Sequence, residues 1–548
     1  MLTQRIVEVD GHSLTIEQVI AVARHHHEVQ INPETFAKIE RFRQGLEAAA
    51  IRGDIMYGVN TGCGSRKNQV LPSDELSDYQ MRYIPAHCCG YGNPLPPEVT
   101  RAAMLVRLNN FLKGHSGVRP CLIERLRDCL NLGLTPVVPE FGSVGASGDL
   151  IPLAHMSAGI IGLEEGQMFV ADEIQPARTA LENHGLKPLT LAAKEAMALT
   201  NGANFIAAIA CLAVVDGWIL LETADLATAL SLEAIRGEQN AFDARIHEAR
   251  PLPGQVHSAA RIRKFTEGSR RITEEARSVA FPDEQKKFSH GKQVPRVQDA
   301  YSFRCAPQIH AAAYQALSHL ESILEVELNS ATDNPLVFED GENGAQYIAI
   351  SGGNFHGQPL AAPLDYLAIA LTPLAGASDR RGFALTTPRL SYGLPADLAG
   401  PNTANTGLMI VQYGVASLVN QIALLANPCS THSITTSADQ EDWVSMGMNS
   451  ALKVRSILPI IRRVLAAELF MASQGITLTQ HLLPENLQQL GLGTGEAYGH
   501  IRGVFQKETD KGAQAWFNDR YLKAELDAVE GMLADGSLLQ SVCNALTT

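Results

Sequence analysis

The stretch IHAAAYQALSHLESILEVEL, residues 309–328, decides the class of the fold. Its apolar residues recur every three or four positions, which places them on one face of a helix. The residues on that face are Ile309, Ala313, Ala316, Leu317, Leu320, Ile323, Leu324 and Leu328. The spacing therefore predicts one helix of more than about four turns, packed against a core.

A second stretch of this kind covers residues 452–473, where Pro459 predicts a kink or a helix start. Alternation with a period of two is short, as in residues 346–351, so a large sheet is not expected. Glycine and proline interrupt the pattern often up to about residue 205 and less often beyond it. We expect a mainly α protein with an N-terminal domain, 1–205, and a helix-bundle domain, 206–548.

Charge and composition limit the kinds of partner that the chain is expected to bind. Its 548 residues carry a formal net charge of −14 and no run of Lys or Arg, which argues against a nucleic-acid partner. Residues 203–221 are apolar but include Asp216, so we expect a buried core helix and not a membrane span. Nine cysteines without a CxxC pair are typical of reduced thiols in the cytoplasm. His25–His27 is interpreted as a solvated helix face.

The loop GSVGASGDL, residues 142–150, is the best candidate for chemistry. A plain glycine turn before a helix starting near Pro152, capped by Ser147 or Asp149, would explain it. A phosphate loop would need Gly-Lys-Ser/Thr, and a nucleophile elbow would need glycine where Asp149 stands. In a tight bend, the Gly148 nitrogen can instead attack the Ala146 carbonyl. Loss of water, including the Ser147 hydroxyl, would leave a methylidene on an imidazolone ring.

This loop, with other blocks in order along nearly the whole chain, resembles the aromatic amino acid ammonia-lyases and aminomutases. The resemblance implies an electrophilic 4-methylideneimidazol-5-one (MIO) group made from Ala146, Ser147 and Gly148, without pyridoxal phosphate (PLP) or a metal. It also implies an all-α fold like that of the fumarase/aspartase superfamily, with an N-terminal MIO-bearing domain and a central bundle of long helices. The family forms homotetramers whose active sites combine residues of several subunits.

The other blocks are YGVNTG at 57–62, LTNG at 199–202, QDAYSFRCAPQ at 298–308 and GGNFHGQ at 352–358. The resemblance makes Tyr57 the catalytic base, which requires a local fall of its pKa from about 10. It places Asn201 beside the substrate amine and Phe355 near the substrate. Tyr301 would support the reacting centre, Gln298 would orient neighbouring groups, and the planar fork of Arg304 suits a substrate carboxylate.

The sequence does not decide which aromatic ring the substrate carries. His87 and Glu441 match positions of histidine ammonia-lyases and could bind an imidazole, although tyrosine aminomutases can also carry that histidine. Asp439, Trp443 and Gly357-Gln358 depart from the histidine enzymes, and the last pair resembles phenylalanine and tyrosine enzymes. The bulk of Trp443 would add apolar surface near the pocket.

The sequence thus predicts a lyase that deaminates an aromatic L-amino acid, histidine or phenylalanine/tyrosine, to the trans α,β-unsaturated acid and ammonia. The substrate amine would add to the methylidene carbon, and a base would take the β-proton. Two alternatives stay open: an aminomutase that returns the amine to the β-carbon, and a helical scaffold whose loop never cyclises. The loop typical of the fumarase/aspartase enzymes, Ser-Ser-x-Met-Pro-x-Lys-x-Asn, is absent from the sequence.

Overall fold

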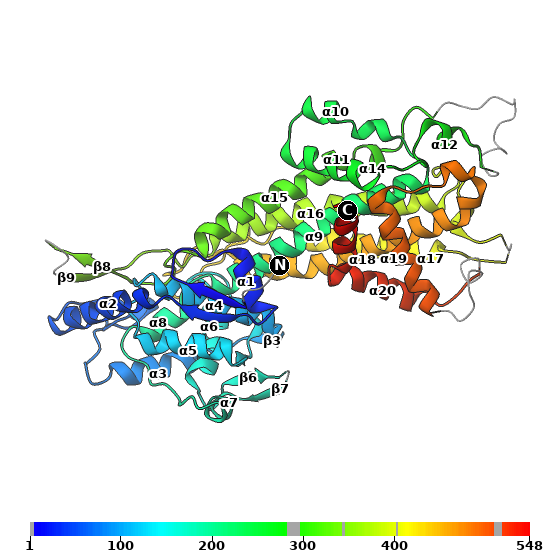
Figure 1. Cartoon of the computed structure of the whole chain (residues 1–548). Helices are drawn as coiled ribbons and strands as arrows, with labels where there is room; N and C mark the ends of the chain where they lie inside the picture. Colours follow the sequence, from blue (N-terminus) through cyan, green and yellow to red (C-terminus); the bar gives the residue numbers. More distant parts are fainter. Residues whose placement is uncertain are drawn as a thin grey trace. The chain divides into compact units, whose positions relative to one another are not determined.

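The computed structural model describes residues 5–171, 173–281, 296–341, 346–401, 404–508 and 518–547. Most of these residues are helical, and the strands form only small sheets of two or three members (Figure 1). The predicted fold class is therefore confirmed, including the long helix over residues 309–328, which is α15 (Ala306–Glu327).

The chain folds into two compact units, each assembled from segments that are distant in sequence. Unit 1 contains Met1–Val214, His319–Asp365 and Pro428–Val454, and unit 2 contains Val215–Ser318, Tyr366–Asn427 and Arg455–Thr548. Four of the five boundaries between them fall inside a long helix: α9 (Asn204–Ala234), α15, α16 (Gln358–Thr386) or α18 (Gly447–Thr479). The fifth, at 427/428, follows the end of α17 (Met409–Leu425). The two-domain division after residue 205 stays a prediction, and its boundary falls in the first turn of α9.

Unit 1 combines short helices with four small sheets. Its helices are α1 (Ile16–Ala23), α2 (Pro33–Ile51), α3 (Leu76–His87), α4 (Pro97–Leu112), α5 (Pro120–Asn131), α6 (Leu150–Ile161), α7 (Ala177–Asn183) and α8 (Glu195–Thr200). Its strands are β1 (Ile6–Val9), β2 (Glu28–Ile31), β3 (Tyr91–Pro94), β4 (Thr135–Pro136), β5 (Pro139–Phe141), β6 (Gln167–Val170), β7 (Glu173–Pro176), β8 (Leu336–Asp340) and β9 (Gln346–Ile350). Only β1 and β2 pair in parallel; β3–β5, β4–β6–β7 and β8–β9 are antiparallel.

Two features of unit 1 create its core. Helix α4 is buried from Val99 to Leu112, with α1, α2 and α5 packed against it. A second apolar cluster joins α2 and β8 to the loop after α2, and its members are Phe42, Leu46, Ala49, Met56, Val59 and Val337. Because Met56 and Val59 are buried in that cluster, they anchor the loop that carries Tyr57 between them.

Unit 2 is a bundle built on the remaining parts of the long helices. Its own helices are α10 (Ala244–Glu248), α11 (Pro253–Phe265), α12 (Glu274–Ser278), α14 (Tyr301–Arg304), α17 (Met409–Leu425), α19 (Leu492–Glu508), α20 (Lys523–Ala534) and α21 (Ser537–Ala545). Glu468 of α18 accepts hydrogen bonds from Ser231 of α9 at 2.7 Å and Ser378 of α16 at 2.6 Å. Arg381 neutralises this buried carboxylate, so one ion pair ties three helices together.

Two helices, α9 and α16, are apolar and long enough to cross a membrane by length and composition alone. In the structure, 78% and 67% of their most apolar windows are buried inside the protein. Asp225 of α9 is also buried, and it pairs with His310 and Arg261. The expectation of a core helix at residues 203–221 therefore agrees with the structure.

Three local expectations have mixed outcomes. The alternating residues 346–350 form β9, as predicted. His25–His27 do not lie on a helix, because α1 ends at Ala23 and they occupy the turn before β2. Pro459 is not a helix start, because α18 continues through it from Gly447 to Thr479.

Candidate active site

The loop 142–149 is bent by glycines in conformations that other residues rarely adopt. Gly145 and Gly148 have φ angles of 72° and 76°. A Cβ on Gly148 would lie 2.2 Å from the carbonyl carbon of Gly202, so only glycine fits there. The Gly202 amide donates to the Ser147 carbonyl at 3.1 Å, and the Asp149 amide donates to the Gly202 carbonyl at 2.8 Å. The tripeptide 146–148 is therefore held against the segment that follows α8.

The side chain of Asp149 ties this loop to helix α9, a role that the sequence did not suggest. Helix α6 begins at Leu150, two residues before the expected start, and the Asp149 side chain does not cap it. Its carboxylate instead accepts from the Phe205 and Ile206 amides of α9 at 2.9 and 3.0 Å, and from the Ser143 hydroxyl at 2.9 Å. Burial raises the pKa of Asp149 to about 6, although these donors and Arg107 act to lower it.

Two backbone groups in the bend lack partners. The Ala146 carbonyl and the Gly148 amide make no hydrogen bond to any residue that the structure describes. Both residues are buried, and buried peptide groups are usually paired. These are the two groups that would have to join if the tripeptide closed into a ring.

The Ser147 side chain lies on the more accessible side of the loop. Its hydroxyl donates to Oε1 of Glu441 at 3.1 Å, and Oε2 of Glu441 accepts from the Thr436 hydroxyl at 3.0 Å. Glu441 reaches this position because its segment runs along the glycine loop. There the Met446 amide donates to the Val144 carbonyl at 2.9 Å.

Tyr57 occupies the loop between the buried Met56 and Val59, and its phenol oxygen accepts from the Gly64 amide at 3.1 Å. The expected fall of its pKa is not found. Burial raises the pKa of Tyr57, and the nearby Cys63 and Glu441 raise it further, while the Gly64 amide acts to lower it. The expectation was wrong because burial and the neighbouring acidic groups favour the neutral phenol.

His87 and Asn201 lie at the ends of α3 and α8. His87 is the last residue of α3, and its ring stacks on Tyr83 with 4.0 Å between the ring centroids. Its Nδ1 lies 2.7 Å from the Tyr83 carbonyl oxygen, and its Nε2 has no hydrogen bond to a described residue. Asn201 is only 3% exposed and follows α8 directly. Arg107 of α4 donates to the carbonyls of Asn201 and Ala198, so a buried cation fixes the end of α8.

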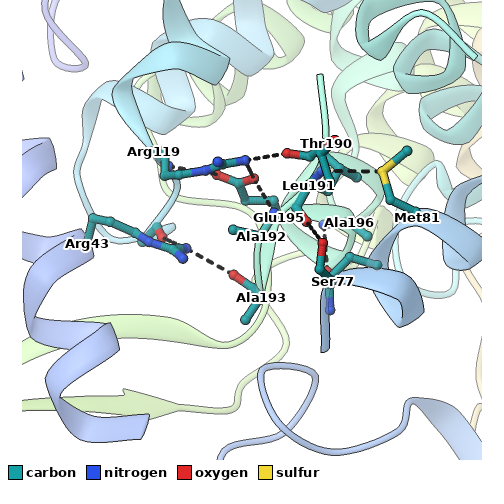
Figure 2. Close-up of polar contacts among 12 residues, drawn as sticks. Arg43, Ser77, Met81, Arg119, Thr190, Leu191, Ala192, Ala193, Glu195 and Ala196 are labelled. Atoms are coloured by element: carbon teal, nitrogen blue, oxygen red, sulfur yellow. Dashed lines mark hydrogen bonds and ion pairs between the residues drawn. The ribbon is translucent and has the colours of Figure 1, made fainter. Parts of the chain in front are cut away.

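The segment that leads into α8 is fixed by side chains from several elements (Figure 2). Arg119 donates to Glu195 and to the Thr190 carbonyl, and Arg43 donates to the Ala193 carbonyl at 3.0 Å. Ser77 of α3 donates to the Leu191 carbonyl at 3.0 Å. These contacts fix the start of a six-residue helix that is too short to be stable alone, and so they determine where Asn201 lies.

Lys194 lies within this segment and is fully buried, with a left-handed φ of 79°. Its ammonium pairs with Asp333, which also accepts from the Ser116 hydroxyl at 2.8 Å. Burial lowers the pKa of Lys194, and the charge of Asp333 opposes that fall. The pair joins the approach to α8 to the segment before β8.

Phe355 is half-buried in a loop that lies beside residues 443–445. His356 Nε2 lies 3.2 Å from the Trp443 carbonyl oxygen, and the Trp443 indole donates to Gln358 at 3.2 Å. Trp443 is 58% exposed. Its ring is therefore attached to the Phe355 loop and is not buried in the core.

The remaining sequence-predicted residues, Gln298, Tyr301 and Arg304, belong to unit 2. The Arg304 guanidinium lies 4.6 Å from the centre of the Tyr301 ring, and its Nε donates to the Asp299 carbonyl at 3.1 Å. Gln298 is exposed and Tyr301 is 69% exposed. The structure thus forms one cluster in unit 1, around Ser147, and a second in unit 2, around Arg304.

Sequence reasoning missed three groups that hold these clusters: Thr436, Arg107 and the Lys194–Asp333 pair. None belongs to the motifs quoted above, and each acts through a partner far away in sequence. For Arg107 and Lys194, the sequence offered one signal: a basic residue within an apolar helical pattern. Among the described residues, no group of three or more His, Cys, Asp or Glu side chains is arranged to hold a metal ion.

The model of the aromatic amino acid lyase family matches residues 14–503. Histidine ammonia-lyase of Chloroflexus aurantiacus is 43% identical over 502 residues, which cover 91% of this chain and 92% of that protein. Histidine ammonia-lyase of Koribacter versatilis is 40% identical over 547 residues, with 98% and 100% coverage.

Solved structures agree with the sequence relatives. Tyrosine aminomutase from Streptomyces globisporus superposes with a TM-score of 0.88 at 34% identity, covering 98% of both chains. Histidine ammonia-lyase from Trypanosoma cruzi gives 0.84 at 34% identity, covering 98% of this chain and 95% of the other. The fold is thus that of the fumarase/aspartase-like helical enzymes. On these grounds the chain belongs to the aromatic amino acid lyase family, whose members act on small-molecule amino acid substrates, and it is a carbon–nitrogen lyase.

Proposed function

We propose that this lyase releases ammonia from an aromatic L-amino acid by means of an MIO group formed from Ala146, Ser147 and Gly148. The observation that carries the proposal is the bent tripeptide, in which the Ala146 carbonyl and the Gly148 amide are buried and have no hydrogen-bond partner among the described residues. Gly148 has no side chain to obstruct its nitrogen, and its left-handed φ of 76° keeps the bend tight. The residues present therefore fit the group.

When present, the group supplies an electrophilic carbon that captures the substrate amine and makes it a better leaving group. The surrounding residues bind the substrate and move its protons. Arg304 would bind the substrate carboxylate through its planar fork, with Tyr301 and Gln298 beside it. Asn201 would orient the amine, and Tyr57 would take the β-proton.

Histidine is the first substrate to test. The curated relatives at 40–43% identity are histidine ammonia-lyases, and two side chains suit an imidazole. Nε2 of His87 has no hydrogen bond to a described residue, and the Glu441 carboxylate, which contacts Ser147, accepts N–H donors. Trp443 and Gln358 favour a phenyl or phenol ring instead: the two side chains share a hydrogen bond, and the indole offers apolar surface to a ring of that kind.

The direct test is to supply histidine, phenylalanine and tyrosine separately and to follow the absorbance of urocanate, cinnamate and coumarate. We expect urocanate to form fastest, and no product from the Ser147→Ala variant. The intact mass of the wild-type protein should be lower than the sequence mass by two waters. An unmodified mass in an active preparation would refute the proposed group, and a folded but inactive unmodified protein would favour the scaffold alternative.

An aminomutase is the second candidate, because tyrosine aminomutase structures superpose with TM-scores of 0.87 and 0.88. Chiral chromatography of the products separates the two activities. A β-amino acid as the main product would replace the lyase assignment, whereas its absence would support deamination.

We also propose a homotetramer with shared active sites. Exposed apolar residues support this, among them Ile410, Tyr413 and Leu424 on α17, since a soluble protein seldom leaves such a helix uncovered. Mixing Ser147→Ala with Tyr301→Phe subunits during refolding tests the sharing. Partial recovery of activity would show that one site takes these residues from different chains, and no recovery in mixed tetramers would contradict it.

For partners other than substrate, we keep the predictions of no nucleic acid and no membrane, and of a cytoplasmic location. The net charge of −14 and the lack of a CxxC pair among the nine cysteines support these predictions.

A further inference from the structure

Glu441 is in contact with the Ser147 hydroxyl. The Ser147 hydroxyl donates to Oε1 at 3.1 Å, and the Thr436 hydroxyl holds Oε2 at 3.0 Å. Both hydrogen bonds orient the carboxylate toward the one oxygen that the side chain of Ser147 must lose. A substrate-binding role for Glu441 would not require this contact, because the Ser147 hydroxyl is gone from the mature site.

Loss of that hydroxyl requires two proton movements. The Cα proton of Ser147 must be removed, and Oγ must gain a proton so that it leaves as water. The nearby buried carboxylate of Asp149 is occupied by Ser143 and by two α9 amides. Among the described residues, Glu441 is the acidic group that is hydrogen-bonded to the Ser147 hydroxyl.

We propose that Glu441 is the proton shuttle that dehydrates Ser147 while the prosthetic group forms, an inference that rests on the proposed function. Its carboxylate accepts the Cα proton and returns it to Oγ. The Cβ–Oγ bond breaks as the Cα–Cβ double bond forms, water leaves, and the carboxylate is regenerated. The step is balanced without any other acid, base or oxidant. Glu441 thereby has a role in maturation that precedes turnover.

Thr436 is the positioning residue for this step. It forms a backbone bridge with Glu441, with N–O distances of 2.8 and 3.3 Å, in addition to its side-chain bond. Between them, Ser437, Ala438 and Asp439 all have left-handed φ angles of 49–62°. Such a turn is unfavourable for residues other than glycine, so the surrounding contacts must hold it in place.

The test compares maturation of wild-type protein with that of Glu441→Gln, Glu441→Asp and Thr436→Val. Asp442→Asn is the matched control, because it removes the adjacent exposed carboxylate that has no contact with Ser147. Each protein is synthesised in a cell-free reaction, and its intact mass and borohydride-sensitive absorbance are followed with time. Circular dichroism and melting temperature check that every variant folds.

We expect Glu441→Gln to lose at most one water, or to lose the second about a hundredfold more slowly than wild type. Thr436→Val and Glu441→Asp should mature at intermediate rates, and Asp442→Asn at the wild-type rate. Loss of two waters by Glu441→Gln at the wild-type rate would overturn the inference and leave the proposed function intact. An unmodified wild-type mass would instead remove the proposed function. If Glu441→Gln fails to fold, wild-type maturation of Thr436→Val and Glu441→Asp would overturn the shuttle.

Discussion

Replacing Asp149 by alanine should be among the most damaging single changes in unit 1. Its carboxylate satisfies three buried donors: the amides of Phe205 and Ile206 at the start of α9, and the Ser143 hydroxyl. A buried donor left without a partner costs about 1–3 kcal/mol. Three such donors therefore predict a loss of about 3 kcal/mol or more from the free energy of unfolding.

Asp149→Asn is the matched control. An asparagine side chain has the same shape and can accept from the two amides through Oδ1 while its Nδ2 donates to the Ser143 oxygen. Only the charge is lost, so the expected cost is about 1 kcal/mol, the difference between a charge-assisted and a neutral set of hydrogen bonds. The comparison isolates the missing hydrogen bonds from the missing charge.

Urea unfolding measures both variants, followed by circular dichroism at one protomer concentration because oligomer stability depends on concentration. The intact mass is recorded in parallel. We expect the alanine variant to lose more stability than the asparagine variant and to mature more slowly, because the side chain that ties the loop to the start of α9 is gone. Equal stability of Asp149→Ala and wild type would refute the assignment of Asp149 as the cap of α9.

Three further outcomes are expected. Because burial raises the pKa of Tyr57, the fraction of its phenolate form is still increasing as the pH rises above neutrality. If this phenolate is the catalytic base, kcat/KM should increase about tenfold per pH unit in that range. Tyr57→Phe should abolish that rise, and a flat profile in the wild type would contradict the base role. Gly148→Ala should retain the full sequence mass, because its Cβ would lie 2.2 Å from Gly202; normal maturation would show that the bend tolerates a side chain. Lys194→Met should destabilise the protein by about 3–5 kcal/mol by leaving Asp333 charged and unpaired, and adding Asp333→Leu should recover part of that loss in denaturant titrations. Additive effects of the two changes would argue against the pair.

The long helix over residues 309–328 and the position of the glycine loop could be predicted from the sequence, because both depend on neighbours a few residues apart. The 3.6-residue spacing across 309–328 specifies α15 without reference to the rest of the chain. Gly145 and Gly148 likewise predict a bend, because they adopt left-handed φ angles that are unfavourable for other residues. The motif at 298–308 also indicated that Tyr301 and Arg304 belong together, and they do lie on one short helix.

What the sequence alone determined is thus the helical class, the bent tripeptide and the family to which both belong. The tertiary structure decided the rest, because burial and long-range contacts have no local signature. It directs Asp149 to α9, brings Thr436 and Glu441 to Ser147, and keeps α18 continuous through Pro459. It also reverses the expected shift of the Tyr57 pKa, since the desolvation of a phenol depends on which distant segments cover it.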